Sequence, residues 1–405
     1  MESTVSGVAM PTGPMCGSGP VHRVRRRRST AQRLAAVSCA ALVAACGGED
    51  GTGPDPDPPV VPLMIEVAGR VERGAVVGVR AFRDGATDPA AGVEWSAEPA
   101  GAVEWVAADS ARLLRAGAVT ILAETTDARG ERVVDVAVPP TVVFDRLVDG
   151  NRDIYRVALD GGDLVRLTSH PSDDRDPTVA GGTVVFVGYR DGNGELYRLP
   201  LAEAGAAPQR LTATPSAESA PSLSPDGARL AYASDGTGVS KLWTAAADGG
   251  GAARATEGFG HGGSIEGSPA WSPGSDRVVF MATSEGTADL YTLDAATGAI
   301  APLVVADGAD VEPAWSPDGG RVVFVSNRDG PTSLYLLEVA TGAVVRLTHG
   351  PGPDGQPAWL PDGRIVYISW EPGTPELRWL DPAAPAAVHT IPIGAGEPGH
   401  PAGAG

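Results

Sequence analysis

The sequence predicts an all-β protein, a six-bladed β-propeller preceded by a small β-sandwich. The main observation is a twelve-residue segment, PAWSPDGGRVVF at 313–324, which recurs at 269–280 and in shorter or looser form at 357–367 and 221–232. Its tryptophans, Trp271, Trp315 and Trp359, stand 44 residues apart, within the period of about 40 to 50 residues that one propeller blade occupies. Upstream of the repeats, short alternating apolar segments separated by turn residues predict the sandwich.

The full repeat contains an inner segment, a Pro-Asp-Gly turn, an apolar strand, a second strand with Leu-Tyr or Leu-Trp, and an Arg-Leu-Thr ending. Six copies are present. Their apolar strands end at Phe144, Phe186, Tyr232, Phe280, Phe324 and Tyr367. The regular spacing of these ends predicts six blades over residues 141–405.

The strands of the repeat are apolar on both faces, as at 322–325, so each needs a neighbour on both sides. Radial stacking of four-stranded sheets supplies those neighbours. The Pro-Asp-Gly turn and the segment Asn-Arg-Asp-Gly at 327–330 suit tight bends and hairpins. A β-solenoid, the alternative, would need shorter and more uniform units.

The repeat resembles the TolB-like (PD40, WD40-like) propeller family. The segments 312–319 and 326–330 follow the family pattern almost letter for letter, and the resemblance extends over 141–402. It implies six blades and the binding of a peptide at one end of the central channel.

The end of the sequence looks like the beginning of another inner segment, Glu-Pro-Gly-His-Pro-Ala at 397–402. Because the first repeat lacks its inner segment, we expect this stretch to complete the first blade and close the ring. No Trp or Pro-Asp-Gly follows, so we expect a short strand; the alternative is an irregular tail.

Residues 62–140 form the predicted sandwich. The segments Val-Glu-Trp-Ser at 93–96 and Ala-Gly-Ala-Val-Thr-Ile at 116–121 resemble bacterial Ig-like domains of the Big2 type. We expect Trp95 to pack in the core, and the domain to act as a spacer.

The N-terminus has the pattern of an export signal. Five arginines between Arg23 and Arg28 precede a short apolar run, and Val-Ala-Ala-Cys at 43–46 fits a bacterial lipobox. We predict a signal peptide over 1–45, lipidation of Cys46, and a flexible tether over 46–61; in the alternative, Cys46 is an unmodified bystander. The prediction places the protein on the periplasmic side of the envelope, at the outer rather than the inner membrane.

The net charge and the positions of the cysteines limit the kinds of partner and covalent link that we expect. The net charge is −19, and it becomes −24 without the six arginines and one glutamate before Cys46. Such a chain repels nucleic acid and anionic lipid head groups, so we expect no nucleic-acid partner and membrane attachment through the lipid anchor alone. The other cysteines, Cys16 and Cys39, lie in the signal, which leaves no disulfide in the exported chain. We expect a monomer.

No catalytic or cofactor motif is present: the sequence lacks GxSxG, HExxH and GxxxxGK. The cluster Asp-Gly-Asn-Arg-Asp at 149–153 has the early spacing of a calcium loop but lacks its later ligands, so a hairpin turn is the better interpretation. We therefore predict no catalytic residues, no metal and no cofactor.

The candidate binding site is a set of polar residues at the inner segments, where a propeller channel opens. These residues are Asp176, Glu218, Glu266, Glu312, Gln356 and His400. We expect the four acids to ring one mouth and to receive a basic or polar peptide; alternatively, they cap turns. We also expect specificity to lie in the residue before each proline, which varies between copies.

The predicted function is a non-enzymatic binding or scaffold protein of the bacterial envelope, with an envelope protein or peptide as partner. The alternative is a glycan-binding or glycan-active propeller, which would need paired carboxylates and aromatic platforms. A third possibility is the sensory domain of a larger assembly.

Overall fold

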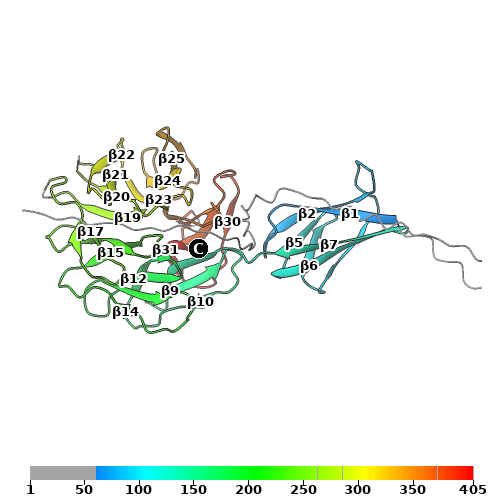
Figure 1. The fold of residues 1–405 in the computed structure, drawn as a ribbon, viewed down its shortest axis with the longest axis horizontal. Helices are drawn as coiled ribbons and strands as arrows, with labels where there is room; N and C mark the ends of the chain where they lie inside the picture. The colour runs from blue at the N-terminus through cyan, green and yellow to red at the C-terminus, as the bar shows by residue number, and fades with distance from the viewer. Residues whose placement is uncertain (1–60, 262, 285, 372, 405) are drawn as a thin grey trace, which may run out of the picture. The chain divides into compact units, whose positions relative to one another are not determined.

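The computed structural model describes residues 61–404 apart from 262, 285 and 372, and every regular element in this part is a β-strand (Figure 1). It contains no helix with the length and apolar character needed to span a membrane. The predicted signal peptide, Cys46 and nearly all of the tether lie outside the described residues.

The N-terminal β-domain forms a seven-stranded sheet in the order β3-β6-β7-β1-β2-β5-β4. Its strands are β1 (Val61–Ala68), β2 (Val76–Arg83), β3 (Glu94–Glu98), β4 (Val103–Ala107), β5 (Ser110–Leu113), β6 (Gly117–Glu124) and β7 (Ala128–Val136). Alternate residues of β1, β2 and β6 are buried in one apolar core, as their sequence pattern predicts. Trp95 and Trp105 stack at 5.9 Å between ring centres and pack against that core.

The propeller has six four-stranded antiparallel sheets, one for each sequence repeat. Blade 1 contains β8 (Thr141–Val148), β9 (Asn151–Ala158), β10 (Val165–Arg166) and β31 (Glu397–Ala404). Blade 2 contains β11 (Asp174–Ala180), β12 (Thr183–Gly188), β13 (Glu195–Pro200) and β14 (Gln209–Arg210). Blade 3 contains β15 (Glu218–Leu223), β16 (Arg229–Ser234), β17 (Lys241–Ala246) and β18 (Ala253–Arg254).

The remaining blades repeat this order. Blade 4 contains β19 (Glu266–Trp271), β20 (Arg277–Ala282), β21 (Asp289–Asp294) and β22 (Ile300–Val304). Blade 5 contains β23 (Asp310–Trp315), β24 (Arg321–Ser326), β25 (Ser333–Glu338) and β26 (Ala343–Arg346). Blade 6 contains β27 (Asp354–Trp359), β28 (Ile365–Ser369), β29 (Glu376–Leu380) and β30 (Val388–Thr390). The six blades predicted from the repeats are thus confirmed.

The apolar core of the propeller lies between blades. Six clusters of buried side chains each join two neighbouring sheets, and in one of them Val279 of blade 4 packs with Phe324 of blade 5. This arrangement explains why the strands are apolar on both faces, because each sheet contacts a sheet on either side.

The threonine of the Arg-Leu-Thr ending holds the outer and middle strands together. The hydroxyl oxygens of Thr168, Thr212 and Thr348 accept hydrogen bonds of 2.8 to 3.0 Å. The donor in each blade is the backbone N–H of the first apolar residue of the third strand. The repeated threonine therefore has a structural role.

The Arg-Asp-Gly hairpin of the repeat also has a structural role. Arg328 binds both oxygens of the buried Asp310 at 2.8 Å and lies 5.1 Å from the ring centre of Tyr335. The Tyr335 hydroxyl in turn donates to Asp329 at 2.6 Å. One hairpin thus joins the start of the inner strand to the third strand of the same blade.

The C-terminal segment closes the ring. β31 pairs antiparallel with β8, with Glu397 opposite Leu147 and Ala404 opposite Thr141. The expected closing strand is therefore present, whereas the expectation that it would be short is wrong, since β31 has 8 residues. The cluster at 149–153 forms a hairpin, in which Asp149 and Gly150 both have positive φ, as the turn interpretation predicted.

Candidate functional site

Each inner strand has a bulge at its Xaa-Pro pair, where two residues face one on the neighbouring strand. In blade 6 the register shifts between Gly355 and Ala358, so Gln356 and Pro357 together oppose one residue of β28. The other five blades shift at the equivalent place. Proline lacks the N–H that a regular ladder needs, which is why it is found in strands mainly at edges and bulges.

The six residues before these prolines all have left-handed backbone conformations. Their φ values are 51° for Asp176, 46° for Ala220, 48° for Ser268, 52° for Glu312, 55° for Gln356 and 36° for His400. Residues other than glycine rarely adopt positive φ, and clusters of such strained positions occur at binding and active sites. We call these six residues the channel ring.

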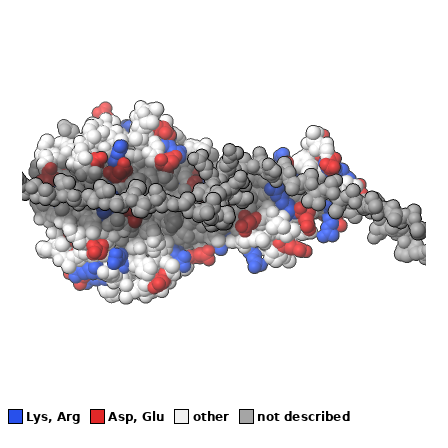
Figure 2. Space-filling view, viewed as in Figure 1, with Lys and Arg blue, Asp and Glu red and all other residues white. Residues whose placement is uncertain are grey.

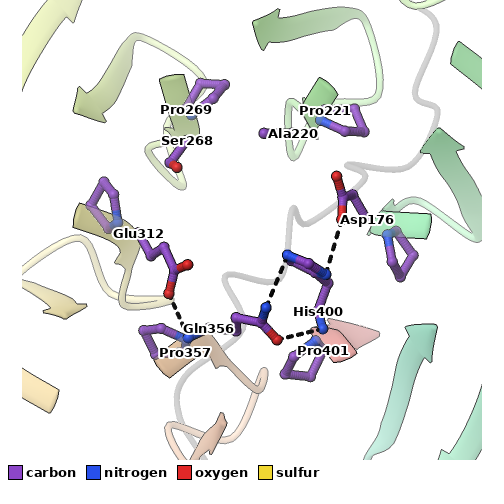
Figure 3. A pocket seen from close by; sticks show the side chains of 12 residues that line it. Asp176, Ala220, Pro221, Ser268, Pro269, Glu312, Gln356, Pro357, His400 and Pro401 are labelled. Atoms are coloured by element: carbon purple, nitrogen blue, oxygen red, sulfur yellow. Dashed lines mark hydrogen bonds and ion pairs between the residues drawn. The ribbon is translucent and has the colours of Figure 1, made fainter. Parts of the chain in front are cut away.

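The channel ring and its prolines line a cavity of about 170 Å³ in the centre of the propeller (Figure 3). Asp176, Glu312, Gln356 and His400, four of the six predicted site residues, lie in this ring. The structure thus places the varying residue before each proline at the channel.

Glu218 and Glu266, the other two predicted residues, are not in the ring. Both side chains are 2 % exposed or less. Each lies two positions before the ring position of its blade, at the start of the inner strand, as do Asp174, Asp310 and Asp354 in their blades. The distance to the proline separates the two sets of acids: the acids of the ring directly precede it, whereas Glu218 and Glu266 stand three positions before it. The expectation that the four acids together ring the mouth is therefore wrong.

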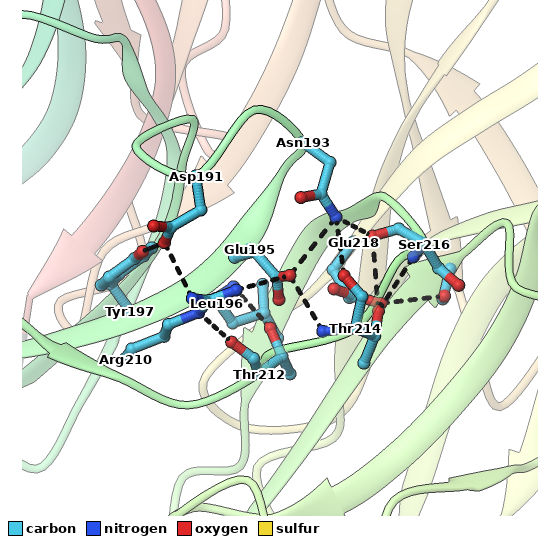
Figure 4. A network of polar contacts seen from close by, with 11 residues as sticks. Asp191, Asn193, Glu195, Leu196, Tyr197, Arg210, Thr212, Thr214, Ser216 and Glu218 are labelled. Atoms are coloured by element: carbon cyan, nitrogen blue, oxygen red, sulfur yellow. Dashed lines mark hydrogen bonds and ion pairs between the residues drawn. The ribbon is translucent and has the colours of Figure 1, made fainter.

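Glu218 belongs to a buried network with Glu195 (Figure 4). Its carboxylate accepts from Thr214 at 2.9 Å and from Ser234 at 3.1 Å. Burial, together with the neighbouring carboxylate of Glu195, raises the pKa of Glu218 to about 7. Burial also opposes ionisation of Glu195, but hydrogen bonds from Thr212 and Arg210 outweigh it and lower the pKa of Glu195. These contacts join blades 2 and 3.

Glu266 makes a buried ion pair with Lys241, the single lysine of the sequence. The Lys241 ammonium lies 3.0 Å from Glu266 Oε1 and donates to the Ser264 carbonyl at 2.6 Å. Glu266 also accepts from the backbone N–H of Leu242 and from the Thr256 hydroxyl. The pair thus joins blades 3 and 4 and is not available to a ligand.

His400 binds two carboxylates, one from its own blade and one from blade 2. Its Nδ1 lies 2.9 Å from Asp176 Oδ1 and 3.2 Å from Asp145 Oδ1. Burial opposes a charge on the ring, but the hydrogen bonds to Asp145 and Asp176 outweigh it and raise the pKa of His400 to about 10. Burial likewise opposes ionisation of Asp176, yet the hydrogen bond from His400 lowers the pKa of Asp176.

Sequence reasoning missed Asp145, because this residue comes from the apolar strand β8 and is 255 positions from His400. Asp145, Asp176 and His400 each offer one ligand atom within 4.8 Å of the others, a spacing that suits a metal ion. A proton on Nδ1 shared with the two carboxylates accounts for the same distances.

Gln356 lies on the other side of the His400 ring. Its Oε1 accepts from the backbone N–H of His400 at 2.8 Å, and its Nε2 lies 3.0 Å from His400 Nε2. The second contact is a hydrogen bond only when His400 Nε2 carries no proton. When Nε2 carries a proton, as the raised pKa of His400 implies at neutral pH, the bond from the backbone N–H to Gln356 Oε1 is the one that remains.

The opposite end of the channel is apolar. It contains Trp271, Trp315 and Trp359 with the prolines of the Pro-Asp-Gly turns, around a cavity of about 510 Å³. Trp271 and Trp359 are 8 % exposed or less, and Arg229 and Arg321 lie over their rings at 4.5 and 5.0 Å. Because arginines and neighbouring blades cover these two rings, neither offers the open platform that a glycan needs.

Charged side chains of both signs are mixed on one face of the protein. Acidic and basic side chains alternate over the described part of the face shown in Figure 2, without a broad patch of one sign. The channel ring differs from this surface, since among the described residues its Glu312 carboxylate has no Lys, Arg or His within salt-bridge distance.

Comparison with known proteins supports the propeller assignment. Residues 259–381 match the family model of the TolB β-propeller domain. The fold is similar to TolB from Acinetobacter baumannii, with 15 % identity, a TM-score of 0.60, and coverage of 76 % of this chain and 82 % of that one.

The fold is also similar to a putative TolB from Agrobacterium tumefaciens, with 20 % identity, a TM-score of 0.53, and coverage of 64 % and 90 % of the two chains. A chain of a nidogen/laminin complex has 11 % identity and the same TM-score, with coverage of 65 % and 97 %. No curated protein sequence matches. At these identities the similarities show the six-bladed fold alone.

Proposed function

We propose that this protein is an exported, lipid-anchored, non-enzymatic binding or scaffold protein of the bacterial cell envelope. It binds a peptide segment of an envelope partner at the channel ring. In this proposal Cys46 carries the lipid, the tether spans 46–61, and the N-terminal β-domain is an Ig-like spacer. The match to the TolB β-propeller domain supports the envelope location.

The observation that carries the proposal is the conformation of the channel ring. Six residues with side chains occupy backbone positions that favour glycine, and five of the six are polar or charged. Glycine would form the same bulges with less strain. The retained side chains therefore indicate a role in the channel, and unfavourable backbone geometry is typical of binding sites.

Glu312 determines the kind of peptide. Its Oε2 accepts from the backbone N–H of Gln356 at 2.6 Å, and no cation of the described residues pairs with it. An ionised carboxylate in a narrow channel attracts a positively charged group. The peptide therefore carries lysine or arginine at the point where it enters the ring.

The test is binding of the exported chain to an array of lysine- and arginine-containing peptides, followed by titration of the tightest binder. We expect Glu312→Gln to weaken binding about fivefold or more, the equivalent of about 1 kcal/mol. Glu338→Gln, at an exposed position of the same blade, is the matched control. Equal affinity for both variants, or no binding of any basic peptide, would overturn the proposal.

A further inference from the structure

The backbone N–H groups of the channel ring form a relay with the side chains of the preceding blade. The N–H of Gln356 donates to Glu312 Oε2, and the N–H of His400 donates to Gln356 Oε1. The N–H of Ala220 also acts on the Asp176 carboxylate and helps to lower the pKa of Asp176. At Gln356 and His400, the side chain of one blade thus satisfies the N–H of the next.

The relay is interrupted after Ala220 and after Ser268, because both have short side chains. The N–H groups of Ser268 and Glu312 follow them, and in the described part of the chain no side chain accepts from either one. Ser268 and Glu312 occupy the same bulge position, with similar φ values of 48° and 52°, as Gln356 and His400, whose N–H groups point to the side chain of the preceding blade. Figure 3 shows the short side chains of Ala220 and Ser268 beside the open centre.

Two adjacent N–H groups on the wall of a polar channel favour a hydrogen-bond acceptor. The charge of the site determines which acceptor it takes. Asp145, Asp176 and Glu312 supply three carboxylates; Asp145 pairs with Arg152 and His400, Asp176 pairs with His400, and Glu312 has no counter-ion among the described residues. A ligand carboxylate or phosphate would be repelled by this excess of negative charge. A neutral amide carbonyl accepts the same hydrogen bonds without that repulsion.

We infer that the N–H groups of Ser268 and Glu312 bind a main-chain carbonyl of a peptide, while the Glu312 carboxylate binds the cationic side chain beside it. The ligand class is an extended peptide containing lysine or arginine, recognised by its backbone as well as by its charge. This inference rests on the proposed function and adds a carbonyl oxygen of the ligand as the acceptor for the two N–H groups.

The experiment compares two small probes on the full exported chain by NMR titration. N-acetyl-lysine methylamide carries the lysine cation and amide carbonyls, whereas n-butylamine carries the same cation and no carbonyl. One neutral hydrogen bond corresponds to roughly a three- to tenfold difference in affinity, so we expect the wild-type chain to prefer the amide probe by about that factor.

The variants test where the carbonyl binds. Ser268→Gln copies the arrangement of Gln356 and supplies an acceptor to the Glu312 N–H from within the protein, so the preference for the amide probe should fall to about one- to twofold. Ser268→Met has a similar size but no such acceptor, and it should keep the preference even if both probes bind more weakly. Thermal melting confirms that both variants are folded.

Each outcome has one meaning. Equal affinity of the two probes for the wild-type chain, with loss of both in Glu312→Gln, would overturn the carbonyl site and leave the proposed function intact. Equal loss of preference in Ser268→Gln and Ser268→Met would also overturn the carbonyl site. Failure of both probes to bind the wild-type chain, together with failure of the basic peptides, would overturn the proposed function as well.

Discussion

Removing the buried ammonium of Lys241 should destabilise the propeller far more than removing an exposed charge from the adjoining blade. In Lys241→Met, Glu266 keeps the N–H of Leu242 and the hydroxyl of Thr256 but loses its counter-ion, while both members of the pair are 2 % exposed or less. Breaking a buried pair on one side typically costs about 3 to 5 kcal/mol. For a domain of this size that corresponds to a fall in Tm of about 6 to 20 °C.

The assay is thermal unfolding of the exported chain, followed by tryptophan fluorescence. Arg277→Met is the matched control, since its partner Asp276 is 3.9 Å away and both side chains are more than half exposed, so the expected loss is below about 1 kcal/mol. The double variant Lys241→Met with Glu266→Gln removes the unpaired charge and keeps an acceptor for Leu242, so it should recover more than half of the loss. A Tm for Lys241→Met within 1 °C of that for Arg277→Met would refute the reasoning.

Two further predictions concern titration. The pKa of Glu218 in the folded state is raised to about 7, so the folded protein binds a proton here more tightly than the unfolded chain does. The resulting contribution to the free energy of unfolding is fully present below the usual glutamate pKa and is lost as pH rises from about 4.5 through 7. Glu218→Gln should therefore be more stable than wild type at pH 8 and lose this dependence in pH-resolved denaturant unfolding; an unchanged slope would contradict it. For His400, NMR titration of the imidazole should show a pKa near 10 that falls in Asp176→Asn, and a wild-type value near 6.5 would contradict the ion pair.

The fold could be predicted from the sequence because its information is local and repeated. Strand ends, Pro-Asp-Gly turns and Arg-Asp-Gly hairpins are each encoded within one repeat, and the six repeats support one another. The tryptophan spacing alone placed the inner strands of blades 4, 5 and 6, with Trp271, Trp315 and Trp359 each at a strand end.

The site was only partly predictable, because it depends on which residues a bulge turns toward the channel. Asp176 and Glu312 directly precede a proline and face the cavity, whereas Glu218 and Glu266 start their strands and point into the contacts between blades. Both sets are acidic and close to the same proline, so composition cannot separate them. Ring closure was predicted from the segment at 397–402, but Asp145 lies within an apolar strand and far from His400 in the sequence, so no local pattern marked it as a partner of His400.

The seam between β8 and β31 links binding to the integrity of the whole ring. His400 belongs to β31, Asp145 to β8 and Asp176 to the neighbouring blade, so opening the seam would separate the three groups. A ligand that binds only the assembled channel ring stabilises the closed state by an amount that depends on its concentration relative to its Kd. A bound partner would then hold the ring closed, and the protein should resist unfolding, proteolysis and domain exchange most strongly while the partner is bound.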